Sequence, residues 1–534
     1  MRGRNSIGWG VLALAASGML AQAVTSGCAG DAGLRRGRSA THGNRPEALG
    51  ALDPEALLER GHRLYGQHCE ACHGARGAGD GELSPFLSPA PRDFADGRFK
   101  LVSSVDGAPF DRDFVEMLRR GMPGSSMPSY AWLEEADLWG LSAVVRELAV
   151  EGSAARLQGA DEEPGAIGAA ASLALATELM TPTDALAVPA HVPPDGDVLA
   201  RGKVLFLQQC SDCHGLTGQG RPQHPVWDED GSVNRARDFT AGFLKGGASF
   251  EDVVHRIRSG MPGTAMPSHE LAADDLAAVA HYVRSLIPAG AEDALVQRRE
   301  HVRAARVSEL PEGPDAMAWQ DASRTKVTLA PLSWEDESVT AVSVAAVHDG
   351  ERVALRLSWP DRTHDGGSDI EAGNVDACAV QLASEPGVPL TGMGSALHPT
   401  TILHWRAAWP EDAEAFLSGI RPHGRAARGT DGAVLDAPHY VPMPPEHSQE
   451  ARGHESVGPG RLVDDTAASV GVAASARWSD DAWRVQFVLD AARFRSEAGA
   501  ARTLEASFAV WNGAAGDHGP RKAISIWQVL ELLP

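Results

Sequence analysis

The pentapeptide Cys-x-x-Cys-His occurs twice in this chain of 534 residues, at Cys69–His73 and at Cys210–His214. Two thiols one helical turn apart can form thioethers to the two vinyl groups of one porphyrin, and the next histidine then lies beneath the iron. With six cysteines and 20 histidines in the chain, one chance match is expected roughly a few times per thousand such chains. Two matches therefore predict two covalent haems c, attached through Cys69, Cys72, Cys210 and Cys213.

Other uses of paired cysteines explain the pattern less well. A zinc ribbon closes two Cys-x-x-Cys pairs around one metal at a spacing of about 15 to 20 residues, whereas these pairs stand 141 residues apart. A thioredoxin-like redox pair needs only one motif, no following histidine and a βαβ setting. Structural disulfides leave the trailing histidine of both pairs unexplained.

The length and the charge limit the function classes. A chain of 534 residues holds roughly three to four domains. The formal net charge of −23 argues against a nucleic-acid partner, because a phosphate backbone would be repelled. An acidic surface suits a protein that meets basic patches on partner proteins, and it is equally typical of a solvated surface without a partner.

Residues 1–27 are typical of an export signal peptide. Arg2 and Arg4 precede the mostly apolar stretch Ile7–Val24, and no other stretch is apolar enough to span a bilayer. Cleavage after Ala21-Gln22-Ala23 competes with cleavage before Cys28, where the sequence resembles a bacterial lipobox with Thr in place of the usual Leu. Cys28 is then either lipidated, which makes the product a lipoprotein, or free. Both cleavage sites predict export to the periplasm, where c-type haem is attached.

Two regions of the chain form an internal repeat. In each, Gly and an aromatic residue precede the haem motif, and Arg-Asp-Phe, a Gly-Met-Pro-Gly-x-x-Met-Pro turn and a closing helix follow it. The closing helices are expected at Glu134–Leu148 and Ala272–Leu286. A flexible tether is predicted at 28–50, the first unit at 51–150 and the second unit at 195–288. The Ala- and Pro-rich linker at 151–194 has a composition that does not predict a core, and a charged helix or loop at 289–315 is the predicted connector.

These repeats resemble class I cytochromes c, small all-α domains whose first and last helices cross at the haem edge. The resemblance implies His73 and His214 as proximal iron ligands, and Met127 and Met266 of the Met-Pro turns as distal ligands. A thioether is a soft, neutral ligand that favours Fe(II) and blocks the sixth position. Met122 and Met261, five residues earlier, are the rival ligands and otherwise pack in the core. One departure is Val144, which aligns with Tyr282 of the second closing helix.

From residue 316 to 534 the periodicity changes from helical to alternating. Val339–Val347 and Val353–Trp359 flank Asp-Gly and predict a β-hairpin, and a second hairpin is expected at 477–489. Asp376–Leu382 and Leu504–Trp511 add strands, so an antiparallel β-sandwich is predicted. Residues 410–470, rich in Pro, Gly and His, predict a long surface insertion. Cys378 is expected to be a buried thiol on its strand.

This C-terminal region resembles the haem-binding subunit of ethylbenzene dehydrogenase and related molybdenum enzymes of the dimethyl sulfoxide reductase superfamily. The matching segments are Leu357–Asp361, Asp376–Gln381, Gly392–Gly394 with His404–Arg406, and Phe508–Gly513 with Arg521-Lys522. The resemblance implies a noncovalent haem b held by one methionine and one lysine. Those roles fall on Met393 and Lys522.

Chemistry constrains that ligand pair. Lysine ligates only as a free amine, so Lys522 would have to lie buried near the iron, with its proton affinity reduced. Otherwise Lys522 is an ordinary surface lysine and Met393 a core methionine. Because imidazole is the commoner haem ligand, His398 and His404 are alternative ligands of the haem b iron.

Together these features predict a tri-haem protein of the respiratory chain that transfers single electrons. It would connect a molybdoenzyme with catalytic and iron-sulfur subunits to a soluble cytochrome or a quinol oxidoreductase, with a lipid anchor as its only membrane contact. By itself it would be an electron-transfer subunit rather than an enzyme. Two alternatives stay open: a diheme dehydrogenase acting on a small substrate, which predicts one c unit without its methionine ligand, and a cytochrome with a C-terminal binding module.

Overall fold

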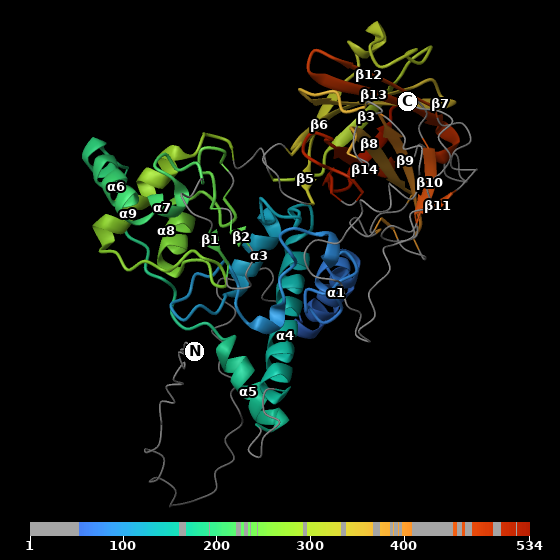
Figure 1. Cartoon of the computed structure of the whole chain (residues 1–534). Coiled ribbons are helices and arrows are strands. Elements are labelled where there is room, and N and C mark those ends of the chain that lie inside the picture. The colour runs from blue at the N-terminus through green and yellow to red at the C-terminus, as the bar shows by residue number, and fades with distance from the viewer. Residues whose placement is uncertain are drawn as a thin grey trace, which may run out of the picture. The chain divides into compact units, whose positions relative to one another are not determined.

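The fold is that of a computed structural model of the whole chain (Figure 1). It describes residues 53–159, 167–191, 193–220, 226–228, 233–234, 236–242, 244–291, 296–332, 338–366, 374–384, 388, 393–394, 398–407, 452–456, 462–464, 473–494, 503–519 and 521–534. The proposed signal peptide, Cys28 and most of the insertion at 410–470 lie outside the described residues. Two helical repeats are followed by a β-domain, which confirms the predicted fold class.

The first repeat is a helical domain closed by two crossing helices. Its helices are α1 (Pro54–His68), α2 (Glu70–His73), α3 (Asp111–Arg120) and α4 (Glu135–Gly159). Asp53 caps α1 through its side chain, and Pro54 occupies the first turn, where its missing N–H costs nothing. At the crossing, a Cβ on Gly61 would lie 2.2 Å from the carbonyl oxygen of Gly140. Only glycine therefore allows α1 and α4 to approach this closely.

The second repeat has the same plan. It consists of α6 (Gly196–Gln209), α7 (Ser211–His214), the short pair β1 (Val226–Trp227) and β2 (Val233–Asn234), α8 (Phe250–Ser259) and α9 (Ala273–Leu286). Gly202 stands at the crossing, where a Cβ would lie 2.1 Å from the carbonyl oxygen of Ala278. Tyr282, one turn later, packs against Phe206 with ring centroids 5.3 Å apart, whereas Val144 fills the equivalent place in the first repeat.

The linker between the repeats is more ordered than its composition predicts. α4 continues to Gly159, eleven residues past the expected Leu148, and α5 (Ala169–Leu179) follows. Met180, just after α5, is 2% exposed and belongs to the hydrophobic core of the first repeat. The carbonyl of Met180 also accepts a hydrogen bond from Arg146 of α4 at 2.5 Å. The first helical domain thus includes part of the segment that the sequence assigned to a linker.

The C-terminal region is a β-domain built on one 14-stranded, curled sheet (Figure 1). The strand order along its main path is β11-β10-β9-β8-β14-β16-β3-β6-β7-β13-β12, with β15, β4 and β5 off this path. Its strands are β3 (His301–Arg306), β4 (Arg324–Thr328), β5 (Ala330–Pro331), β6 (Ala341–His348), β7 (Arg352–Pro360), β8 (Ala377–Ala383), β9 (Thr400–Arg406), β10 (Arg452–Ser456), β11 (Leu462–Asp464), β12 (Ala473–Ser479), β13 (Ala482–Asp490), β14 (Thr503–Trp511), β15 (Ala523–Ile524) and β16 (Gln528–Leu532).

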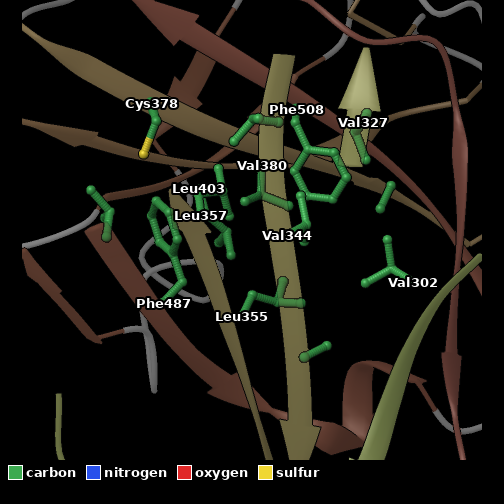
Figure 2. Packing of buried hydrophobic residues seen from close by; sticks show 14 of the residues in the cluster. Val302, Val327, Val344, Leu355, Leu357, Cys378, Val380, Leu403, Phe487 and Phe508 are labelled. Atoms are coloured by element: carbon green, nitrogen blue, oxygen red, sulfur yellow. The ribbon is translucent and has the colours of Figure 1, made fainter. Parts of the chain in front are cut away.

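The core of the β-domain forms where strands from both halves of the sheet turn apolar side chains inward. Figure 2 shows this packing, with Leu355 and Leu357 of β7 near Phe487, and with Cys378 and Val380 of β8. These five residues are fully buried. The predicted hairpins β6–β7 and β12–β13 and the strands β8 and β14 are confirmed, as is the burial of the Cys378 thiol.

One strand was not predicted. β3 pairs in parallel with both β16 and β6 and so lies inside the sheet, although the sequence assigned its segment to a charged connector. Val302 and Ala304 are buried while His301 and Arg303 are exposed, so the segment has a period of two. The prediction of helix or loop was wrong here because charged side chains on the exposed face masked that alternation.

Candidate functional site

In both Cys-x-x-Cys-His motifs the histidine is oriented by a backbone carbonyl and by a stacked phenylalanine ring. Each lies at the end of a one-turn helix, α2 or α7. Nδ1 of His73 lies 3.1 Å from the carbonyl oxygen of Arg92, and Nδ1 of His214 lies 3.3 Å from that of Arg237. With Nδ1–H donating to a carbonyl, Nε2 keeps the lone pair that a metal needs.

The Phe of each Arg-Asp-Phe sequence supports that histidine ring. Phe94 stacks on His73 with centroids 4.7 Å apart, and Phe239 stacks on His214 at 4.5 Å. Burial lowers the pKa of both imidazoles, which keeps them neutral. The Arg-Asp-Phe sequences thus supply a carbonyl and a ring that fix each proximal histidine.

The cysteines of the motifs form no disulfide bonds. Burial raises the pKa of Cys69 to about 12 and that of Cys210 to about 11. Redox-active cysteines require the opposite, a lowered pKa, so these pairs do not resemble thioredoxin-type sites. Within the described part of the chain, no group of three or more metal-binding side chains includes a cysteine, which argues against the zinc ribbon as well.

The Met-Pro turn of each repeat faces the same hollow as the haem motif of that repeat. In both repeats the first methionine of the turn donates its backbone N–H to the carbonyl of the later one at 3.1 Å, from Met122 to Met127 and from Met261 to Met266. In the first repeat, Met122 and Met127 line the same hollow as Cys69, Cys72 and His73, and in the second repeat Met261 and Met266 line the same hollow as Cys210, Cys213 and His214. Which methionine of each turn ligates stays a prediction.

Basic side chains also line these hollows, among them Arg92 and Lys100 in the first repeat and Arg237 and Lys245 in the second. Burial lowers the pKa of Arg237 to about 10 and that of Lys245 well below its ordinary value, with further lowering of the Lys245 pKa by nearby Arg237. Half-buried positive charges that crowd one another favour an anionic ligand. Haem carries two propionates, so the cysteine thiols, neutral imidazoles, thioethers and these cations together fit haem.

Met393 and Lys522 lie at one apolar cluster of the β-domain, which contains Trp511. The Lys522 amine lies 5.0 Å from the ring centroid of Trp511, and Met393 packs in the small apolar cluster that contains Trp511, Ala377 and Ile402. Part of the Lys522 side chain stays solvent-accessible, yet the protein around its amine lowers its pKa to about 8 by desolvation. An amine that loses its proton this readily, beside a thioether, fits the donor set expected for haem b.

The backbone of Met393 adds to this interpretation. Its φ of 53° lies in the left-handed region, which is uncommon outside glycine and is held only by the surrounding structure. Of the alternative ligands, His404 is buried with its ring 5.1 Å from Trp511, while His398 is exposed. Trp511 is therefore the centre of this site. Sequence reasoning included it in a matching segment without giving it a role.

The described helices include none that is both long and apolar enough to cross a membrane. Cys28, the predicted lipidation residue, lies outside the described residues.

Comparison with known families matches three parts of the chain. Residues 58–149 and 199–286 match the model of the family described as cytochrome c, and residues 316–523 match the model described as ethylbenzene dehydrogenase. These segments coincide with the two helical repeats and with the β-domain.

Individual proteins are similar to the chain as well. A Haloferax mediterranei protein assigned as respiratory nitrate reductase heme subunit ORF7 is 23% identical over 235 residues, or 42% of this chain and 70% of that protein. A chain of the Kuenenia stuttgartiensis reducing HAO-like protein complex is 29% identical, with a TM-score of 0.36 over 43% of this chain and 96% of that one. A family 9 carbohydrate-binding module from Caldicellulosiruptor kristjanssonii in complex with glucose is 7% identical, with a TM-score of 0.24 over 44% of this chain and 96% of that module. The chain is a haem-containing electron-transfer protein in which two cytochrome c domains precede a domain of the ethylbenzene dehydrogenase family.

Proposed function

We propose that this protein is an exported tri-haem subunit that relays single electrons between a molybdenum-dependent oxidoreductase and the respiratory chain. The observation that carries the proposal is repeated in both cytochrome c domains. There the haem motif and the Met-Pro turn line one cavity, and the motif histidine is oriented through Nδ1.

The side chains of both domains favour electron transfer over substrate chemistry. When bound, haem supplies one-electron redox chemistry. His73 and Met127 would hold the iron of the first domain, and His214 and Met266 that of the second. A thioether and an imidazole that together held the iron would raise its reduction potential and would leave no coordination position for a substrate. This disfavours the alternative of a diheme dehydrogenase, which needs an open position in one domain.

The β-domain supports a third redox site and a partner enzyme. The Lys522 amine lies over the Trp511 ring, and Met393 packs against the cluster that contains Trp511. These two side chains would hold a noncovalent haem b. The Haloferax relative is assigned as a heme subunit of a nitrate reductase, and the matching family is described by the name of another oxidoreductase. We infer a docked molybdoenzyme with catalytic and iron-sulfur subunits as the partner on one side, and a soluble cytochrome or a quinol oxidoreductase on the other. Periplasmic location, with Cys28 as lipid attachment residue, completes the proposal.

Haem analysis of the purified protein tests it. Acid-acetone extraction separates noncovalent haem b from covalent haem c, and pyridine haemochrome spectra count each. The expected result is two covalent haems and one extractable haem per chain, and co-purification of molybdenum and iron-sulfur subunits from the native host. Covalent haem alone would remove the relay through the β-domain and leave the cytochrome with a binding module.

A further inference from the structure

Three aspartates gather at one end of the β-domain. Asp361 directly follows β7, Asp365 lies in the loop after it, and Asp376 directly precedes β8. One carboxylate oxygen of each lies within 4.8 Å of those of the other two. In the part of the chain that the structure describes, no other group of three or more His, Cys, Asp or Glu side chains is close enough to share a metal ion.

Two of these carboxylates, those of Asp361 and Asp376, are buried, and no described lysine or arginine forms an ion pair with them. Asp376 is 0% exposed and Asp361 is 4% exposed. Burial raises the pKa of Asp376 to about 7 and also raises that of Asp361, and each of the two pKa values is raised further by a neighbouring aspartate. Buried carboxylates need protons, basic partners or a metal.

Asp376 is already held by three donors. Its Oδ2 accepts from the indole N–H of Trp483 at 2.9 Å and from the backbone N–H of Asp365 at 2.8 Å. Its Oδ1 accepts from the backbone N–H of Gly513 at 3.0 Å. A carboxylate fixed in this way is oriented before any ligand arrives.

Asp361 differs because one of its oxygens has no well-placed donor. Oδ1 accepts from the backbone N–H and the hydroxyl of Thr363, both at 3.1 Å. Oδ2 is buried and accepts no hydrogen bond of ordinary geometry, although the buried indole N–H of neighbouring Trp359 interacts with the Asp361 carboxylate and lowers its pKa slightly. A buried acceptor left in this state costs free energy comparable to a lost hydrogen bond. It points to a missing electropositive ligand within the cluster.

We propose that Asp361, Asp365 and Asp376 bind one hard divalent cation, with Ca²⁺ as the best fit. The donors are all oxygens, including the Thr363 hydroxyl that lies 2.6 Å from Oδ2 of Asp365, and oxygen-only sites select Ca²⁺ or Mg²⁺ over softer metals. Ca²⁺ binds oxygen at about 2.3–2.6 Å, so two of its ligands lie at most about 5 Å apart. The spacing within 4.8 Å meets this limit.

A cation here would join three chain segments. Asp361 and Asp365 fix the end of β7, Asp376 fixes the start of β8, and its bond to Gly513 adds the end of β14. Gly513 is two residues from Trp511. The metal would therefore stabilise the same end of the sheet that carries the Trp511 cluster.

Calcium binding to the purified, haem-loaded full-length protein tests the proposal. After treatment with a chelator, equilibrium dialysis against Ca²⁺ with metal analysis should give about one bound ion per chain. Asp361→Asn and Asp365→Asn should each abolish it, because each removes an anionic ligand. Asp321→Asn is the matched control, since Asp321 is an exposed aspartate of the same domain. Ca²⁺ should also raise the thermal unfolding temperature of the wild-type protein and of the control alone.

Two outcomes would overturn the proposal. One is no binding by the wild-type protein at about 10 mM Ca²⁺, which exceeds the roughly 10⁻³ M dissociation constant of the weakest protein sites; the carboxylates then share protons instead. The other is equal binding by the two ligand variants. If the haem content shows that Asp361→Asn does not fold, two measurements still test the proposal: Ca²⁺ binding by the variant of the half-buried Asp365, and the effect of Ca²⁺ on the unfolding temperature of the wild-type protein.

Discussion

The Gly202→Ala substitution tests the helix crossing on which the second cytochrome c domain is built. An alanine Cβ at position 202 would lie 2.1 Å from the carbonyl oxygen of Ala278 and 2.8 Å from Cβ of Tyr282. Ordinary contact begins near 3.4 Å, so the first distance is about 1.3 Å too short. The obstructing atom is backbone of α9, which cannot rotate away as a side chain can.

Two opposing effects set the magnitude. Alanine is favoured over glycine inside a helix by about 1 kcal/mol. Overpacking costs about 1–3 kcal/mol, and the rigid backbone contact places this substitution at the upper end of that range. The net loss is then about 2 kcal/mol, which corresponds to about a 30-fold larger population of the opened domain.

Hydrogen exchange measured on peptides resolves this loss domain by domain. Protection of peptides from α6 and α9 should fall about 30-fold in Gly202→Ala, since both helices open when their crossing is strained. Peptides from α1 and α4 should be unchanged. Gly61→Ala should give the mirror result, because its Cβ would lie 2.2 Å from the Gly140 carbonyl.

Gly196→Ala is the matched control on the same helix. No atom lies within 4 Å of a Cβ at position 196, so protection should be unchanged or slightly higher. The close crossing of α6 and α9 is refuted if Gly202→Ala leaves the protection of both helices at the level of this control.

Three further predictions concern the ligands and the core. Met266→Ala should convert one of the two covalent haems to the high-spin state and lower its potential, because a thioether ligand is lost, whereas Met261→Ala should keep both low-spin; electron paramagnetic resonance distinguishes them. Lys522→Ala should remove the extractable haem b and leave both haems c. The Lys522 amine has a pKa of about 8 before any metal binds, and a proton competes with iron for its lone pair. Haem b should therefore dissociate as the pH falls and be held more tightly as the pH rises. An acid titration followed by the Soret band measures this. A wild-type titration curve identical to that of the Lys522→Ala variant would contradict the prediction. Cys378→Ser should cost about 1–3 kcal/mol of unfolding free energy, because Cys378 is 0% exposed in an apolar core that offers a hydroxyl little solvation; denaturant titration measures it.

The cytochrome c domains were predictable because their sequence signals are local. Haem attachment requires a fixed spacing of Cys and His, and the crossing helices require Gly61 and Gly202 at equivalent positions. The Arg-Asp-Phe sequences were noticed as a shared pattern, but their role is visible only in three dimensions. Phe94 stacks on His73 although 21 residues separate the two in the sequence.

The elements that were missed depend on distant partners. α5 is apolar and Ala-rich, and the reason for its order is Met180, which inserts into a core formed by residues far earlier in the chain. β3 is stabilised by parallel pairing with β16, more than two hundred residues away. Single-sequence patterns do not encode such pairing.

The sites of the β-domain show the same limit. Met393 and Lys522 were predicted from a family resemblance, and the structure adds that Lys522 lies over Trp511 and that Met393 packs against the cluster containing it. The aspartate cluster was not anticipated, since Asp361 and Asp376 belong to separate segments that converge only when the end of β7 lies near the start of β8. Its second signal, the unbonded Oδ2 of Asp361, exists only in the folded protein.

The most direct test of the account is the spin state of the two covalent haems in the purified protein. If His73 with Met127 and His214 with Met266 close both axial positions, paramagnetic resonance and optical spectra should show both haems c low-spin. Neither should bind added carbon monoxide or cyanide readily. High-spin, ligand-accessible iron in both domains would contradict electron transfer as their function and indicate a catalytic site instead.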